Sequence, residues 1–307
     1  MTEAIPEIKT VSGSTAYVDV GQLIGLYITE PRRCILLDGG TASVRDTLEA
    51  ALTAAELRPV GMLATHSHFD HFANARYFQE KYGIPIALPF GEAELCRTYP
   101  AIKSHLFVYS AGEIMANPQL RDMPCNVDRV IMPGENDLFF CGVRFRVLRT
   151  PGHSPDHVSY VTPDGVCYTG DALLCGAQLR HAKLPYAYNF RQFLESVEVF
   201  RDVSCDYLLL PHKGVIEAPF DALLDENRLT LENRLRTVAG IIDREMSMDE
   251  IYAAVREQLH ILVDTPYKAQ SLERFLRPYL ECLRDDGTHR MTVRGGGTLC
   301  YEPVPAV

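Results

Sequence analysis

Short apolar runs and amphipathic stretches alternate along the first two-thirds of the chain. Residues 34–37 and 60–64 are apolar runs bounded by turn residues, as expected for short buried strands. Residues 43–56 instead repeat apolar positions at helical spacing, and Asn189 is placed to cap another amphipathic helix. The expected strands are residues 16–20, 23–29, 34–37, 60–64, 84–88, 137–140, 143–149, 158–161, 166–168 and 207–210; the expected helices are 43–56, 73–82, 89–98 and 190–200.

Strands followed by helices therefore occur twice, once before about residue 90 and once after it. This order predicts an α/β fold of the αβ/βα type: two mixed sheets packed face to face, with helices outside. Residues 99–125 interrupt the pattern with Tyr, Phe, Met and His among Pro and Gly. A connection of this length is either a lid over a site or an insertion packed on the outside.

The pattern of apolar positions changes near residue 225, where long helical segments replace the alternation of strands and helices. Helical spacing covers residues 226–246, Ser247 and Glu250 form a capping box for a second helix, and residues 271–284 predict a third. Residues 288–294 and 298–302 flank three glycines as a hairpin. We therefore expect two domains, residues 1–224 and a small, mainly helical, winged-helix-type module at residues 225–307.

Residues 65–71 have the sequence Thr-His-Ser-His-Phe-Asp-His, which places three of the chain's ten histidines beside an aspartate. His66 and His68 have period-2 spacing, and Asp70 and His71 follow where a helix begins, so one turn can aim all four inward. Imidazole and carboxylate together suit Zn, Fe or Mn. The alternative is a polar loop with surface histidines, but so dense a group favours a metal site.

Further ligand-type residues follow later apolar runs, each beside Gly or Pro: His153, Asp171 and His212. The ordered set HxHxDH, His, Asp, His resembles the metallo-β-lactamase fold superfamily over about residues 15–215. The resemblance implies a metallo-β-lactamase sandwich with the site along one edge. It also implies that Asp38 supports the metal-binding loop without contacting an ion itself, although a simple turn aspartate explains that residue equally well.

The resemblance assigns the ligands to two divalent ions, most readily Zn, with Fe or Mn as alternatives. His66, His68 and His153 would hold the first ion, and Asp70, His71 and His212 the second, with Asp171 between them. Two close ions lower the pKa of a shared water, so a bridging hydroxide can attack a carbonyl or phosphorus. Asp70 and Asp171 are accordingly the candidate catalytic residues.

Comparing this chain's residues with those typical of each branch of the family narrows the range of expected substrates. An aspartate at position 171 disfavours β-lactamase activity, because class B1 and B2 enzymes have cysteine there and B3 enzymes lack a bridging aspartate. His68 disfavours the flavodiiron branch, and Leu174 replaces the tyrosine common in quorum-quenching lactonases. We expect a hydrolase of a small ester, thioester or lactone. A phosphodiesterase or nuclease, and a metal-binding regulator with weak catalysis, are the alternatives.

Residues that follow the ligand loops are candidate substrate contacts, although each could equally belong to the scaffold. They are Arg180, His181, Tyr186, Tyr188 and Lys213.

Composition limits the partners. The 307 residues carry a net charge of −10, which disfavours an extended nucleic-acid surface. Nine scattered cysteines without a CxxC pair suggest a reducing, cytoplasmic location. We expect no signal peptide and no membrane span. Residues 225–307 hold eleven Lys or Arg and fourteen Asp or Glu, so we expect this module to pack on the main domain or on the second subunit of a homodimer.

Overall fold

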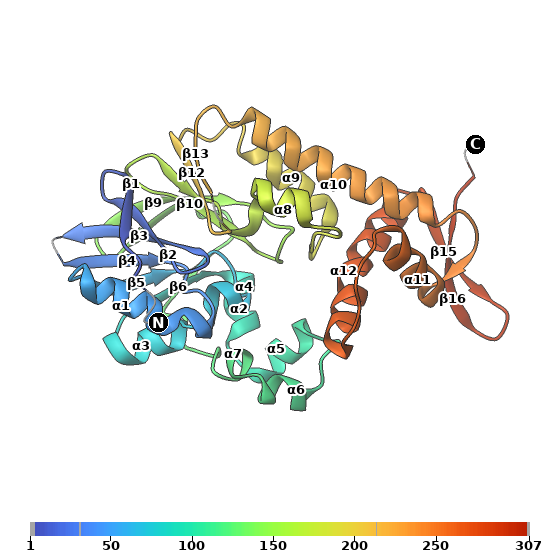
Figure 1. The fold of residues 1–307 in the computed structure, drawn as a ribbon, viewed down its shortest axis with the longest axis horizontal. Helices are drawn as coiled ribbons and strands as arrows, with labels where there is room; N and C mark the ends of the chain where they lie inside the picture. Colours follow the sequence, from blue (N-terminus) through green and yellow to red (C-terminus); the bar gives the residue numbers. More distant parts are fainter. Residues whose placement is uncertain (1–3, 31, 213, 306–307) are drawn as a thin grey trace.

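The computed structural model describes residues 4–30, 32–212 and 214–305, and its centre is a pair of sheets packed face to face (Figure 1). A seven-stranded sheet has the order β1-β2-β3-β4-β5-β6-β7, and a six-stranded sheet has the order β13-β12-β11-β10-β9-β8. Both mix parallel and antiparallel pairs, so the predicted α/β sandwich is confirmed. The strands are β1 (Ile8–Ser12), β2 (Thr15–Asp19), β3 (Leu23–Glu30), β4 (Arg33–Leu37), β5 (Arg58–Leu63), β6 (Ile86–Pro89), β7 (Arg129–Ile131), β8 (Asp137–Phe140), β9 (Val143–Arg149), β10 (Val158–Val161), β11 (Val166–Tyr168), β12 (Tyr207–Leu210) and β13 (Gly214–Glu217).

The period-2 alternation of the strands explains why both faces of each sheet are apolar. In β4, Ile35 and Leu37 point into the layer between the sheets, whereas Cys34 and Leu36 point to the outer layer. In β12, Leu209 joins the inner layer, while its neighbours join the core on the outer side. Runs that are apolar throughout are therefore strands buried on both faces.

Helices cover the two outer faces. Leu48 and Leu52 of α1 and Phe78 of α3 pack on the first sheet, and Phe193 and Val197 of α9 pack on the second. The helices of this part are η1 (Ala42–Val44), α1 (Arg45–Ala54), α2 (Phe69–Phe72), α3 (Ala75–Tyr82), α4 (Phe90–Cys96), η2 (Gly170–Ala172), α8 (Gly176–His181) and α9 (Phe190–Val199).

Every predicted strand of the sandwich is present within two residues of its expected bounds. The strands without a prediction are short or largely exposed: β1 is an edge strand with no fully buried residue, β7 has three residues, and β13 exposes alternate positions. The helix expected at residues 43–56 is shorter, because Glu56 adopts a positive φ of 55° that ends it. Apolar pattern alone therefore finds buried strands and misses exposed ones.

Residues 99–125 are more regular than expected. They form three short helices, α5 (Tyr99–His105), α6 (Ala111–Ala116) and α7 (Pro118–Arg121). Each begins at a capping side chain, namely Thr98, Ser110 and Asn117, which accepts a backbone N–H of the first turn.

The C-terminal region consists of helices and a small sheet. Its elements are α10 (Asp221–Ile241), β14 (Met246–Ser247), α11 (Met248–Gln258), α12 (Pro266–Asp285), β15 (His289–Arg294) and β16 (Thr298–Pro303). The strands pair in the order β14-β16-β15, so the predicted hairpin is confirmed, and the winged-helix assignment stays a prediction.

Two predicted helices of this region have wrong bounds. The helix expected at residues 226–246 both begins and ends five residues earlier, because Met246 is extended and pairs with Tyr301 of β16. The helix expected from residue 271 begins at Pro266, with Thr265 as its N-cap. The predicted domain boundary at 224/225 accordingly lies inside α10.

The C-terminal region shares one apolar core with the second sheet. Phe190 of α9 lies 4.4 Å from Tyr279 of α12 between ring centroids, and the Tyr279 hydroxyl donates to the Pro185 carbonyl at 2.9 Å. Figure 1 shows α10 running from the sandwich to these helices. Among the described residues, no helix is long and apolar enough to cross a membrane.

Asn227 of α10 fastens this region to the loop after Asp171. Its amide is buried; it accepts the Leu174 N–H at 2.8 Å and donates to the Leu174 carbonyl at 3.1 Å.

Asn227→Ala leaves both buried backbone groups unpaired, so we expect a loss of about 2–4 kcal/mol in the free energy of unfolding. Urea unfolding measures it. Arg228→Ala, at an exposed neighbour, is the control and should change stability by less than about 0.5 kcal/mol; equal losses in the two variants would contradict this account.

Candidate metal centre

The predicted ligands all lie in loops that leave strands at one edge of the sandwich. The loop after β5 carries His66, His68, Asp70 and His71, and Asp38 follows β4 directly. From the second sheet, the loops after β9, β11 and β12 supply His153, Asp171 and His212.

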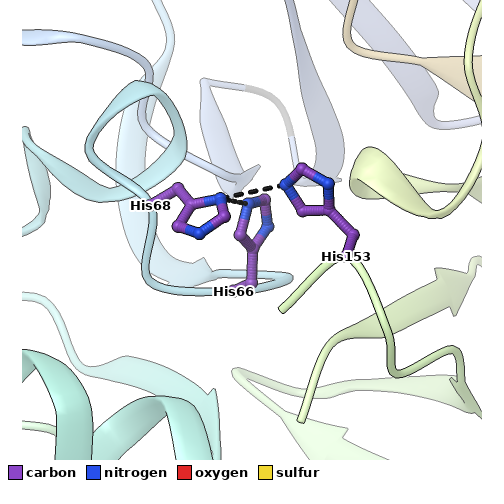
Figure 2. Close-up of side chains that lie close together, drawn as sticks. All are labelled: His66, His68 and His153. Atoms are coloured by element: carbon purple, nitrogen blue, oxygen red, sulfur yellow. Dashed lines mark hydrogen bonds between the residues drawn. The ribbon is translucent and has the colours of Figure 1, made fainter. Parts of the chain in front are cut away.

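Three imidazole nitrogens meet at one point (Figure 2). The Nδ1 atom of His68 lies 3.0 Å from His66 Nε2 and 2.9 Å from His153 Nε2. Burial lowers the pKa of His66 and of His68 well below the ordinary value, and neighbouring imidazoles add to both shifts. The rings are therefore neutral near pH 7 and have lone pairs to offer a shared cation.

A second group lies beside the first. Asp171 Oδ1 is 3.2 Å from His71 Nε2 and 3.2 Å from His212 Nε2, and Asp70 Oδ2 is 3.7 and 3.6 Å from the same two atoms. The other Asp171 oxygen, Oδ2, is 3.3 Å from His153 Nε2 in the first group. One carboxylate thus faces both groups.

Asp38 supports the histidine loop from beneath. Its buried carboxylate accepts the Thr65 N–H at 2.7 Å, the Thr65 hydroxyl at 3.0 Å and the His71 Nδ1–H at 2.7 Å. The Thr65 oxygen can in turn accept the His66 Nδ1–H at 3.0 Å. A carboxylate only accepts, so these bonds place protons on Nδ1 and leave both Nε2 atoms facing the centre. Of the two explanations weighed for Asp38, the structure favours the support.

Two buried residues that sequence reasoning missed hold the ligand loops together. Glu92 accepts the Ser67 N–H and hydroxyl through Oε2 at 3.0 and 2.7 Å, and the Ser154 hydroxyl and Asp156 N–H through Oε1 at 2.7 and 2.9 Å. It therefore joins the loop of His68 to the loop of His153. The only signal of Glu92 in the sequence is that it is an acid near the start of a helix, which is common.

His157 is the other missed residue. Its Nε2 accepts the Asp171 N–H at 3.0 Å, and its Nδ1 lies 2.9 Å from the Thr150 hydroxyl. Gly170 must be glycine here, because its φ is +52° and a Cβ would come within 2.5 Å of that same Nε2. The backbone at Asp171 is thereby held against the His157 ring.

The geometry and the donor set fit metal ions. In each group the donor atoms lie within 4.8 Å of one another. His71 Nε2 and Asp171 Oδ1 are buried and have no hydrogen-bond partner among the described residues, as expected of atoms that bind an ion. Burial disfavours the charged form of His71, but Asp171, Asp70 and Asp38 outweigh it and raise its pKa well above the ordinary value. The same negative field attracts a divalent cation.

A cavity of about 380 Å³ leads to the centre. Asp70, His153 and Asp171 lie in its wall, and its larger part is apolar. Residues 99–125 supply much of that part, including Ile102, Leu106, Tyr109, Leu120 and Met123, so of the two alternatives for this segment the structure favours the one in which it borders the site. Helix α12 adds Tyr267, Gln270, Ser271, Arg274 and Phe275 to the wall.

Among the candidate substrate contacts that the structure describes, Tyr186 lies in the cavity wall and the others lie outside it. Tyr186 lines the cavity, with its ring centroid 5.5 Å from that of His68. Arg180 and His181 are exposed on α8, outside the cavity wall, and Tyr188 is 48% exposed. Lys213 lies outside the described residues.

Two residues of the cavity wall, His105 and Arg274, were not among the candidate contacts chosen from the sequence. His105 lines the wall, and burial together with Arg274 lowers its pKa to about 4, so it is neutral near pH 7. Arg274 enters from α12, about sixty residues after the last ligand. Nothing in the chain order places such a residue beside the histidines.

Comparisons with known proteins agree with this geometry. The model of the metallo-beta-lactamase superfamily matches residues 19–212. The atrochrysone carboxyl ACP thioesterase of Passalora fulva is 23% identical over 305 residues, which cover 94% of this chain and 75% of that protein. A hydroxyacylglutathione hydrolase of Xanthomonas campestris pv. campestris (strain B100) is 31% identical over 205 residues, 66% of this chain and 65% of that protein.

A solved structure shares the whole architecture. A beta-lactamase domain protein from Burkholderia ambifaria superposes with a TM-score of 0.73 at 18% identity, over 97% of this chain and 93% of that one. The likeness extends over the C-terminal region as well as the sandwich.

Glu92→Gln tests the link between the two ligand loops. The amide keeps the volume and one acceptor oxygen, but its NH2 group faces donors of one loop, so the link between the two loops is lost. We expect metal affinity, measured by chelator competition, to fall about 10- to 100-fold. Glu94→Gln, on the exposed side of the same helix, is the control. Unchanged affinity in Glu92→Gln would show that the link does not serve the centre.

Proposed function

The chain belongs to the metallo-beta-lactamase superfamily and is a metal-dependent hydrolase, and we propose that it holds two divalent ions and cleaves a small ester, thioester or lactone. The observation that carries the proposal is Asp171, whose two carboxylate oxygens face separate donor groups. His66, His68 and His153 would hold one ion; Asp70, His71 and His212 would hold the other. We favour zinc, with iron or manganese as alternatives, because the donors are imidazoles and carboxylates.

Ions bound there would supply an activated water and positive charge for the oxyanion that develops during hydrolysis. The chain's own residues supply the rest. Asp171 keeps the two donor groups in register, since its backbone is held by His157 and its carboxylate is only slightly exposed. Asp70 lies in the cavity wall and can accept or return a proton beside the substrate.

The cavity supports a small acyl substrate. Its wall is mainly apolar, and beyond the proposed ligands the charged residues in it are Glu113 and Arg274. A polyanionic strand would need a row of cations leading to the centre, and the chain carries a net charge of −10. One relative is named a thioesterase and another a hydroxyacylglutathione hydrolase, and hydrolysis of a small acyl substrate agrees with this cavity.

All nine cysteines are unpaired, which agrees with a reducing compartment, and we keep a cytoplasmic location as part of the proposal. Helix α12 of the C-terminal region lines part of the cavity, so the proposal gives this region a role in restricting substrate size.

A substrate panel tests the proposal. Purified protein loaded with Zn, Fe or Mn should hydrolyse small thioesters, esters or lactones, and chelation should abolish the turnover. Metal-dependent cleavage of phosphodiesters, with steeply salt-sensitive nucleic-acid binding and no ester turnover, would move the nuclease reading to first place. Metal binding with no turnover of any class would favour a regulator.

Asp171→Ala should lower kcat by about 10³-fold or more, because it removes the carboxylate shared by the two donor groups at the reacting centre. The fold should persist, since Asp171 lies in a loop whose neighbours remain packed. Circular dichroism and metal analysis accompany the kinetics. Wild-type kcat in a folded variant with full metal content would contradict the role given to Asp171.

A further inference from the structure

Arg274 is a cation in the cavity wall without an anionic partner. Its Nη2 donates to the Tyr186 hydroxyl at 2.8 Å and to His105 Nε2 at 3.2 Å, and its guanidinium carbon lies 4.5 Å from the centroid of the Tyr186 ring. Within the described part of the chain, no carboxylate pairs with it. Arg277, one turn further along α12, is by contrast paired with Glu273 at 2.6 Å.

The Arg274 guanidinium packs on the Tyr186 ring, and that ring packs against two histidines of the proposed metal centre. The Tyr186 ring is 5.5 Å from the His68 ring and 5.6 Å from the His153 ring, between centroids. The His105 ring stacks on His68 at 5.9 Å. A substrate group bound by Arg274 would therefore sit close to the bond that is cleaved.

The free hydrogen-bonding groups point to a particular ligand. Arg274 has five N–H donors, and the two contacts just described use those of Nη2, so the N–H groups of Nε and Nη1 have no acceptor in the described residues. Because Tyr186 accepts from Arg274, its own hydroxyl hydrogen is available to a ligand. Planar donors beside a phenol suit a carboxylate, which can accept two parallel N–H bonds.

We propose that Arg274, with Tyr186, binds a carboxylate of the substrate, so that the preferred substrates are esters or thioesters carrying a carboxylate near the scissile bond. This inference rests on the hydrolase function proposed above. A single carboxylate fits better than a polyphosphate, because Arg274 is the one arginine or lysine in the described cavity wall. The apolar side chains of residues 99–125 then take the rest of the substrate.

The carboxylate could belong to the acyl part or to the leaving group, and three thioesters separate these sources. They are the succinyl and pentanoyl thioesters of N-acetylcysteamine and the pentanoyl thioester of 3-mercaptopropionate. Wild type, Arg274→Gln, Arg274→Lys and Arg277→Gln are compared as metal-loaded protein. Arg277→Gln is the matched control, since it removes an arginine of the same helix that lies outside the cavity wall.

Wild type should prefer one carboxylate-bearing thioester over the neutral one in kcat/KM. Arg274→Gln should reduce that ratio by about 10- to 100-fold, as expected for a lost charge-assisted contact. Arg274→Lys should restore part of the ratio, because it keeps the charge without the planar fork. Arg277→Gln should keep the wild-type ratio. Absence of a preference in wild type, or an equal loss on charged and neutral substrates in Arg274→Gln, would overturn the proposal.

Calorimetric binding of uncleaved amides separates this inference from the proposed hydrolysis. N-butylsuccinamate carries a carboxylate on the acyl side and N-pentanoyl-β-alanine carries one on the leaving-group side. One of them should bind wild type at least about 10-fold more tightly than N-butylpentanamide, and Arg274→Gln should lose the difference. If no thioester is cleaved but the amide preference depends on Arg274, the proposed activity fails and the carboxylate site stands. If thioesters are cleaved and all three amides bind equally, the activity stands and the carboxylate site is wrong.

Discussion

The buried carboxylate of Asp38 is the contact on which the metal centre depends. It accepts hydrogen bonds from Thr65 and His71 and, through the Thr65 hydroxyl, fixes His66. Without these bonds the histidine loop would have to satisfy buried imidazole and backbone donors in some other way. The arrangement has a cost, since Asp38 adopts a positive φ of 64°, a conformation that aspartate tolerates better than most residues. Its backbone N–H donates to the Leu63 carbonyl at 2.8 Å, which ties this conformation to the end of β5.

The two halves of the sandwich contribute unequal parts. The first sheet supplies the dense loop with four of the proposed ligands, and the second supplies one proposed ligand from each of three loops. Glu92 crosses between the halves, so the two sets of loops are set relative to each other by hydrogen bonds as well as by the apolar layer. Helix α12 and residues 99–125 then close over the site, with Tyr109 and Ser271 joined at 3.1 Å between hydroxyl oxygens. The cavity is thus a product of segments that lie far apart in the chain.

The sequence revealed the fold class and the grouping of the seven ligand-type residues, because buried strands have continuous apolar runs and the ligands follow them in order. It did not reveal Glu92, His157 or Arg274. These residues act through tertiary contacts with partners 14 to 169 positions away, and single charged or polar residues in helices and loops have no local signature. The errors in α10 and α12 have a similar origin. Met246 is extended because it pairs with β16, and the cap at Thr265 precedes the apolar stripe from which that helix was expected.

The central claim is that Asp171 joins two metal ions, and diffraction data collected at the absorption edge of the bound metal test it most directly. The account predicts two anomalous peaks in each chain. One should lie among His66, His68 and His153, the other among Asp70, His71 and His212, with Asp171 oxygens contacting both ions. Metal analysis of the same protein should give two ions per chain. A single ion in a fully loaded protein, or two ions with Asp171 contacting neither, would contradict the account.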